Sequence, residues 1–154
     1  MAVLVIIAII SAFALPGMQQ LQANSRLSSG ASSFETILAF AKSTAAIQRR
    51  TIVVLTTTTG VTVRQDTTTG TVLQNYDLPT AVTMDTKIAS TTTAISNVQF
   101  TPVGLLQKTD GTAVSITTRV CTSAIKTDVG RTISVSSRGR ITTRRDTDAT
   151  LCNP

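Results

Sequence analysis

Residues 1–16 read MAVLVIIAIISAFALP, and the interpretation of the whole chain depends on what this apolar stretch is. It holds one hydroxyl group, that of Ser11, and no charged side chain. As an α-helix its first fifteen residues rise about 22 Å, less than the roughly 30 Å of a bilayer hydrocarbon core. Three interpretations compete: a cleaved signal peptide, a buried core helix and a shortened membrane anchor.

The surroundings of this stretch separate the three interpretations. A signal peptide carries Lys or Arg before its apolar segment, and none precedes this one. A core helix that is apolar on every side must be covered by its own domain, and the small region that follows could hardly cover it. These two observations argue against the first two interpretations and therefore favour a membrane anchor.

Beyond Pro16 the pattern changes without ending the helix. Residues 17–50 predict an amphipathic continuation, in which polar side chains alternate with apolar ones at helical spacings. The apolar positions are Leu21, Leu27, Phe34, Ile37, Leu38, Ala41, Ala45 and Ile47. Arg49 and Arg50 suit the end of this helix, because cations are favourable at a helix C-terminus. We expect one long helix, kinked near Pro16.

Residues 51–154 predict a β-rich globular domain. Short runs of Val, Ile and Thr are separated there by turn residues such as Gly60 and Gly139. Strands are expected at Thr51–Thr57, Val61–Gln65, Gly70–Asn75, Ala81–Met84, Asn97–Phe100, Ala113–Val120, Arg131–Ser136 and Ile141–Thr143. The chain therefore has three segments: an apolar helix over 1–16, its amphipathic continuation over 17–50, and the β domain.

The composition argues against an enzyme. The chain has no His, the commonest general base and the commonest metal ligand. Its one Glu, Glu35, lies in the predicted helix, and no nucleophile stands beside a base. We expect no catalytic residue, metal ligand, cofactor or small-molecule substrate, and a membrane-anchored enzyme is only a remote alternative.

The two cysteines, Cys121 and Cys152, lack the spacing of a redox or zinc motif. Near the end of a chain with an export-type N-terminus, they predict one structural disulfide. Closing a loop of about 30 residues would contribute roughly 3–4 kcal/mol. The alternative is a pair of free, buried thiols in a cytosolic protein.

The net charge of +6 is concentrated late in the chain. Seven of the 14 Lys and Arg residues fall between Arg119 and Arg145, where Asp128 is the one acid. Such a segment attracts polyanions, including nucleic acids and acidic headgroups. The alternative is a solvated surface that keeps the protein soluble.

The N-terminal run AVLVIIAIISAFALP resembles the helix of type IV pilins and type II secretion pseudopilins. Later motifs resemble the GspH/FimT group of these proteins, in order along nearly the whole chain. They are Ala41–Ala45 (AKSTA), Val53–Leu55 (VVL), Phe100–Gly104 (FTPVG), Val120–Cys121 and Ile133–Ile141 (ISVSSRGRI). The resemblance implies an α+β pilin fold, in which a long N-terminal helix packs on an antiparallel β domain.

The same resemblance makes Met1 correspond to the seventh residue of a mature pilin, when Pro16 is aligned with the helix-kinking proline of the family. The processing motif, close to G-F-T-L-I-E-L, would then lie upstream of Met1. Those residues would bring the apolar stretch to about 20, enough to span a bilayer once. We expect an inner-membrane subunit with a periplasmic domain, found also in an extracellular pilus or a periplasmic pseudopilus.

Assembly with other pilins is the function that the resemblance implies. Each buried Leu or Ile is worth roughly 1.5–3 kcal/mol, so the apolar helix could hold a subunit firmly among sister helices. The residues expected to do so are Leu4, Val5, Ile6, Ile7, Ile9, Ile10 and Leu15, with Pro16 supplying the bend. The leading hypothesis is a minor pilin for priming or tip assembly of a type IV pilus, and the alternative is a minor pseudopilin of type II secretion.

A basic loop suggests a specialised version of this role. Some minor pilins of the FimT type bind DNA during natural transformation through a C-terminal G-R-x-R motif. This chain has Gly139 and Arg140 but Thr142 at the second arginine position, with further arginines at Arg138, Arg144 and Arg145. Guanidinium groups on a flexible loop can follow the backbone of double-stranded DNA without reading bases. The alternative is that these arginines line a subunit interface or face solvent.

Overall fold

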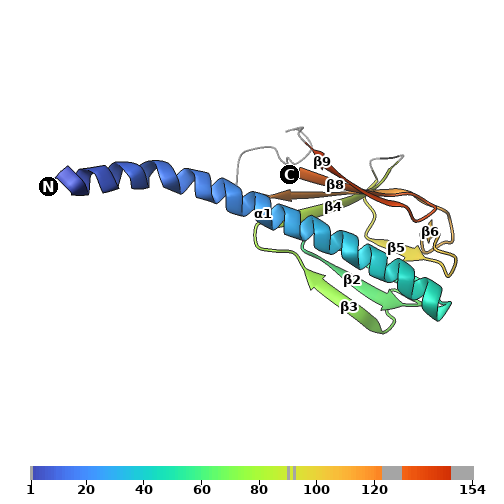
Figure 1. Cartoon of the computed structure of the whole chain (residues 1–154). Coiled ribbons are helices and arrows are strands. Elements are labelled where there is room, and N and C mark those ends of the chain that lie inside the picture. The colour runs from blue at the N-terminus through green and yellow to red at the C-terminus, as the bar shows by residue number, and fades with distance from the viewer. Residues whose placement is uncertain (1, 90, 92, 123–129, 147–154) are drawn as a thin grey trace.

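One long helix dominates the computed structural model, which describes residues 2–89, 91, 93–122 and 130–146. This helix, α1 (Ala2–Gln48), runs through Pro16 and Gly17 without a break. Figure 1 shows its N-terminal half projecting beyond the β domain and its C-terminal half lying along that domain. Helix side chains are described at Met18 and from Gln20 onward.

The half of α1 that lies on the β domain is amphipathic, as the sequence predicts. Its buried side chains follow the helical period: Ala23, Leu27, Ala31, Phe34, Ile37, Leu38, Ala41 and Ala45. Two of the predicted apolar positions do not join this face, because Leu21 is 70% exposed and Ile47 is 81% exposed. Those two lie near the ends of the packed segment, where the domain no longer covers the helix.

Within the described residues, nine strands form two antiparallel sheets beside the helix. The first sheet has the order β3-β2-β1-β5-β6, from β1 (Ile52–Thr56), β2 (Gly60–Gln65), β3 (Val72–Asp77), β5 (Asn97–Phe100) and β6 (Leu106–Gln107). The second has the order β4-β7-β8-β9, from β4 (Val82–Ile88), β7 (Ile116–Thr122), β8 (Gly130–Val135) and β9 (Ile141–Asp146). The antiparallel pairing of every named pair confirms the predicted fold class.

The hydrophobic core lies where α1 meets the two sheets. Phe34 from the helix and Phe100 from β5 are fully buried in it, together with Ile116 and Ile133 from the second sheet. The alternation in residues 131–136 correctly predicts that Ile133 and Val135 point inward. Gly30 faces the β3–β4 connection, where a Cβ would lie 3.4 Å from the Leu78 side chain, at ordinary van der Waals distance.

Strands β3, β7 and β9 end beyond the residues that the sequence predicts, and β4 and β6 depart further from the prediction. Strand β4 continues to Ile88, because its whole length pairs with β7. Strand β6 was not predicted: it has two residues, and Leu106 pairs with Phe100 and is buried. A two-residue strand is too short for its side-chain alternation to stand out in a sequence.

Candidate functional site

Three motifs that lie far apart in the sequence meet at one end of the β domain. Lys42 of α1 donates a hydrogen bond from Nζ to the carbonyl oxygen of Gly139, at 2.9 Å. Gly139 lies in the β8–β9 turn, directly against Gly104 of the β5–β6 loop. The AKSTA, FTPVG and ISVSSRGRI motifs are therefore parts of one structural junction.

Glycine is required at the centre of this junction. Gly139 has φ of 71°, which L residues with a side chain rarely adopt. A Cβ at this position would lie 2.2 Å from the carbonyl oxygen of Gly104 and 3.2 Å from Cε of Lys42. The glycine thus allows both the turn and the close approach of the helix.

The β8–β9 turn, which the sequence analysis treats as a flexible loop, is held by hydrogen bonds. Within the turn, Ser136 N donates to the carbonyl oxygen of Arg140 at 3.0 Å. The turn is also attached to its surroundings, because Ser137 accepts from Leu106 N at 2.9 Å and donates from its own N to Ser115 Oγ at 3.0 Å. Arg138 and Arg140 are exposed on this fixed turn.

Strand β9 separates the other two predicted arginines, Arg144 and Arg145, onto opposite faces. Thr143 points to the helix, where its Oγ1 donates to Glu35 Oε2 at 2.9 Å. Because side chains alternate along a strand, Arg145 shares this face and Arg144 lies on the other. The four arginines therefore do not form one cluster: two lie on the turn and one on each face of β9.

The outer face of the second sheet carries Arg144 together with a basic residue of β7. The register aligns Asp85, Arg119, Thr132 and Arg144 across the four strands. Thr132 donates from Oγ1 to the Asp146 carboxylate. This face was not predicted as a unit, because the register that aligns its residues is not visible in the sequence.

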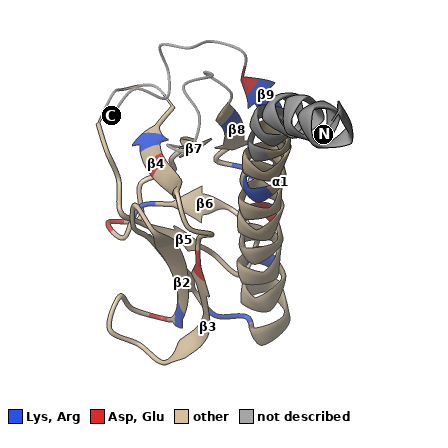
Figure 2. Cartoon of the chain, turned by 90° about the vertical axis from the view of Figure 1, so that its left-hand side faces the viewer, with Lys and Arg blue, Asp and Glu red and all other residues tan. Residues whose placement is uncertain are grey.

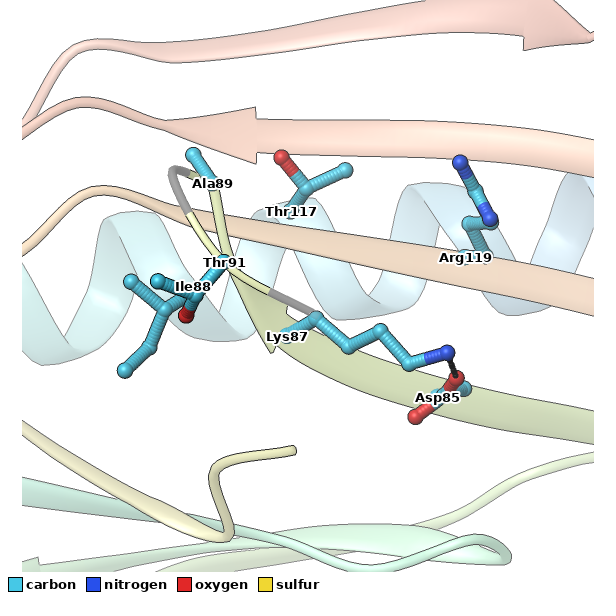
Figure 3. Close-up of a pocket in the computed structure, with 7 residues that line it drawn as sticks. All are labelled: Asp85, Lys87, Ile88, Ala89, Thr91, Thr117 and Arg119. Carbon is cyan, nitrogen blue, oxygen red and sulfur yellow. Dashed lines mark ion pairs between the residues drawn. The ribbon is translucent and has the colours of Figure 1, made fainter. Parts of the chain in front are cut away.

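A hollow of about 410 Å³ lies on the same face and is lined in part by Asp85, Lys87, Thr117 and Arg119. Figure 3 shows the Arg119 guanidinium apart from the ion pair between Lys87 and Asp85, whose Nζ and Oδ2 are 2.8 Å apart. Arg119 Nε is buried without a hydrogen-bond partner. The hollow offers cationic and hydroxyl groups but no nucleophile activated by a base.

Acid–base and metal chemistry find no support in the part of the chain that the structure describes. No group of three or more His, Cys, Asp or Glu side chains comes together there as a metal site. The pKa of Asp110 is lowered, mainly by the hydrogen bond from the backbone N–H of Thr112, on an exposed turn. The hydrogen bond that lowers this pKa also closes the turn, so the shift has a local structural cause.

The predicted disulfide falls partly outside the described residues. Cys121 lies in β7 and is not a free thiol. Cys152 lies beyond the residues that the structure describes. Its pairing with Cys121 stays a prediction.

The predicted filament residues, Leu4 to Pro16, lie in the helical part of α1 whose side chains the structure does not describe. Among the residues it does describe, no helix combines the length and hydropathy needed to cross a membrane. The single membrane pass therefore stays a prediction as well.

Comparisons with known proteins fit this architecture. The family described as Type II transport protein GspH matches residues 30–139, well over half of the chain. The chain belongs to the GspH family. The match includes the junction of Lys42, Gly104 and Gly139, and it ends before Arg140, so the arginines of β9 and the projecting helix lie outside it. No curated protein sequence matches the chain.

Solved structures show the same fold. Two crystal forms of the type IV minor pilin FimU of Pseudomonas aeruginosa match with TM-scores of 0.62 and 0.64 and identities of 27% and 25%. They cover 80% and 82% of this chain and 99% and 96% of the FimU chains. The minor pseudopilin EpsH of the Vibrio cholerae Type 2 Secretion System matches with a TM-score of 0.61 at 14% identity, over 77% of this chain and 96% of that one.

These matches establish a structural subunit. Pilins and pseudopilins are not enzymes, and they interact with other pilins in a filament. The predictions of a GspH-type minor pilin or pseudopilin, a pilin fold and a non-enzymatic role are confirmed.

Proposed function

We propose that this GspH-family subunit is a minor pilin of a type IV pilus, acting in the priming or the tip of the filament. The observation that carries the proposal is the similarity to FimU, at 27% identity over 99% of that chain. The pseudopilin EpsH shares 14% identity, a level that supports the fold alone. A minor pseudopilin of type II secretion is the alternative.

The projecting half of α1 supplies the assembly mechanism. Before assembly it would lie in the inner membrane with the β domain in the periplasm, and afterwards among the helices of other pilins. Both environments would cover the apolar side chains of residues 2–15. Burial of a Leu or Ile such as Leu4, Ile6 or Ile9 is worth roughly 1.5–3 kcal/mol in either place.

Deleting the gene from its own bacterium tests the choice between the two filament systems. The deletion strain should lose surface pili, and a plasmid copy should restore them. Secretion of type II substrates should remain at the parental level. Loss of that secretion with normal piliation would assign the chain to the pseudopilus instead.

Binding of double-stranded DNA is a second candidate function of the same subunit. It is supported by the exposed arginines Arg138, Arg140 and Arg144, which form no ion pair with the acids in the described part of the chain. Guanidinium groups with free donors bind phosphates bidentately. Arg145 faces the helix side and is not expected to join the other three arginines in binding. The binding would be directed to the DNA backbone and sensitive to salt.

A salt titration with the full-length protein in maltoside micelles tests this function. The slope of log affinity against log salt for duplex DNA should become shallower by about 2 in the Arg138→Gln/Arg140→Gln variant, because each lost phosphate contact removes about 0.9. The control variant, Arg26→Gln/Arg49→Gln, loses the same charge from exposed positions on and just after α1 and should keep the parental slope. Equal slopes for all three proteins would reject a DNA site at the turn.

A further inference from the structure

Arg131 and Arg145 form an arrangement of like charges that neither pilus assembly nor DNA binding uses. They are directly opposite each other in the β8–β9 pairing, and both lie on the side of the sheet that faces α1. Like charges in directly opposed cross-strand positions are destabilising. An anion between two arginines in such positions would offset their repulsion.

The carboxylates near them in the described part of the chain do not supply that anion. Glu35 accepts a hydrogen bond from Thr143, and Asp146 accepts one from Thr132 on the other face of the sheet. The two ion pairs among the described residues, Arg50–Asp66 and Lys87–Asp85, involve neither arginine.

A small cavity separates the two arginines from the helix. It has a volume of about 130 Å³ and is lined by Asn24 and Leu27 of α1 and by Arg131 and Arg145. Two guanidinium groups and one side-chain amide are donors that suit a tetrahedral oxyanion such as a phosphate. Leu27 makes one side of the cavity apolar. Among the described residues, no carboxylate on that side would compete with a bound anion for the two arginines.

The cavity lies at the edge of the domain from which the apolar half of α1 projects. Among the described helix side chains, burial against the domain starts at Ala23, next to Asn24. Figure 2, which looks toward this edge, shows basic segments of β8 and β9 beside the helix. The exposed Arg26 lies on the same turn of α1.

The distance to a membrane is short. Asn24 follows Leu15 by nine residues, which corresponds to about 13.5 Å of helix. The headgroup layer extends roughly 5–7 Å beyond the hydrocarbon core on each side. Helix tilt and the long arginine side chains reduce the remaining distance between the arginines and the lipid headgroups.

We propose that Arg131, Arg145 and Asn24 bind the phosphate of an anionic lipid headgroup at the base of the β domain. The proposal rests on the insertion of the apolar helix in a membrane, which is part of the proposed function. The site would hold the domain against the membrane surface before assembly. Extraction into a filament would remove the lipid and leave the arginine pair open for a new partner.

The test observes the arginine side chains directly. The full-length protein is labelled with ¹⁵N-arginine and placed in maltoside micelles, which contain no phosphate. Phosphatidylglycerol, phosphatidylcholine and inorganic phosphate are then titrated in separate samples. The Nε–H signals of Arg131 and Arg145 should shift with phosphatidylglycerol at a concentration about 100-fold lower than with inorganic phosphate, because anchoring in the micelle raises the effective concentration of the headgroup.

Matched variants identify the site. In Arg131→Gln, the Arg145 signal should need about tenfold more phosphatidylglycerol to shift, because one bidentate partner is lost. Arg131→Lys keeps the charge and should weaken the response less than Arg131→Gln. Arg138→Gln removes the same charge in the β8–β9 turn, beyond the opposite end of β8 from Arg131, and should leave both signals at their parental midpoint. An unchanged amide spectrum of the core establishes that each variant is folded.

Three outcomes would overturn the proposal. They are equal midpoints for phosphatidylglycerol and phosphatidylcholine, equal midpoints for lipid and inorganic phosphate, and equal weakening by Arg131→Gln and Arg138→Gln. If lipid does not shift the Arg131 and Arg145 signals while the deletion strain loses its pili, the lipid site is rejected and the minor-pilin function is supported. If the lipid response is as expected while piliation is normal, the minor-pilin function fails alone.

Discussion

The two halves of α1 are continuous in structure and opposite in what surrounds them. From Ala23 to Ala45 one side of the helix is covered by the protein's own β domain. The half before it projects beyond the domain and carries the apolar run of residues 1–15. The comparison teaches that one half of the helix is covered by its own domain, whereas the other would be covered, in the proposed function, by a membrane or by other subunits.

The largest effect should come from a matched pair of phenylalanines, one in each half. Phe34→Ala removes a fully buried ring and should lower the unfolding free energy of the domain by about 3–5 kcal/mol. Phe13→Ala should change it by less than about 0.5 kcal/mol, because residue 13 precedes the part of the helix that the domain covers. Thermal unfolding in micelles measures both. Equal losses would mean that the projecting half packs on its own domain.

The predicted disulfide should stabilise the β domain and should leave the projecting half of α1 unaffected. Non-reducing mass spectrometry should find Cys121 joined to Cys152, and Cys152→Ser should cost the domain about 3–4 kcal/mol through a more flexible unfolded chain. Helicity of the projecting half, followed by circular dichroism in micelles, should persist after the domain melts. Two free thiols in periplasmic protein would disprove the disulfide.

Gly139→Ala should loosen the junction between the packed half of α1 and the β8–β9 turn. The added Cβ would face the Gly104 carbonyl oxygen at 2.2 Å in a backbone conformation that alanine disfavours, at a cost of about 2–3 kcal/mol. Gly111→Ala is the control: its φ is also positive, at 85°, but nothing lies within 4 Å, so only the backbone cost of about 1–2 kcal/mol applies. Denaturant unfolding should rank the two variants in this order, and the reverse order would contradict the close approach.

The smallest effect should appear at the boundary between the two halves. Leu21 is 70% exposed, so Leu21→Ala should change the stability of the domain by less than about 0.5 kcal/mol. The same variant should reduce incorporation into pili if the uncovered surface of the helix continues past Pro16. Normal incorporation, measured by immunoblotting of sheared pili, would limit the assembly surface to the residues before it.

The elements that the sequence predicted well are those whose pattern repeats over several residues. The helical spacing from Leu27 to Ala45 and the alternation around Ile133 and Val135 both correspond to buried faces. Leu21 and Ile47 follow the same helical spacing and are exposed. Periodicity identifies a face of the helix, but the size of the covering domain decides where that face begins and ends.

The candidate site was less predictable than the fold. The sequence grouped Arg138, Arg140, Arg144 and Arg145 because they are close along the chain. Alternation within β9 could have separated Arg144 from Arg145. The opposition of Arg131 and Arg145 could not have been found in this way, because it depends on the register of two strands joined by a turn.

The sequence by itself determined the long helix with its apolar beginning, the β domain and the family motifs, because each depends on residues that are near one another in the chain. The tertiary structure alone decided that Lys42, Gly104 and Gly139 form one junction. It also decided that the late arginines divide among a turn, an outer face and a cavity beside the helix. Such placements follow from strand register and close packing, which bring together groups that no local pattern connects.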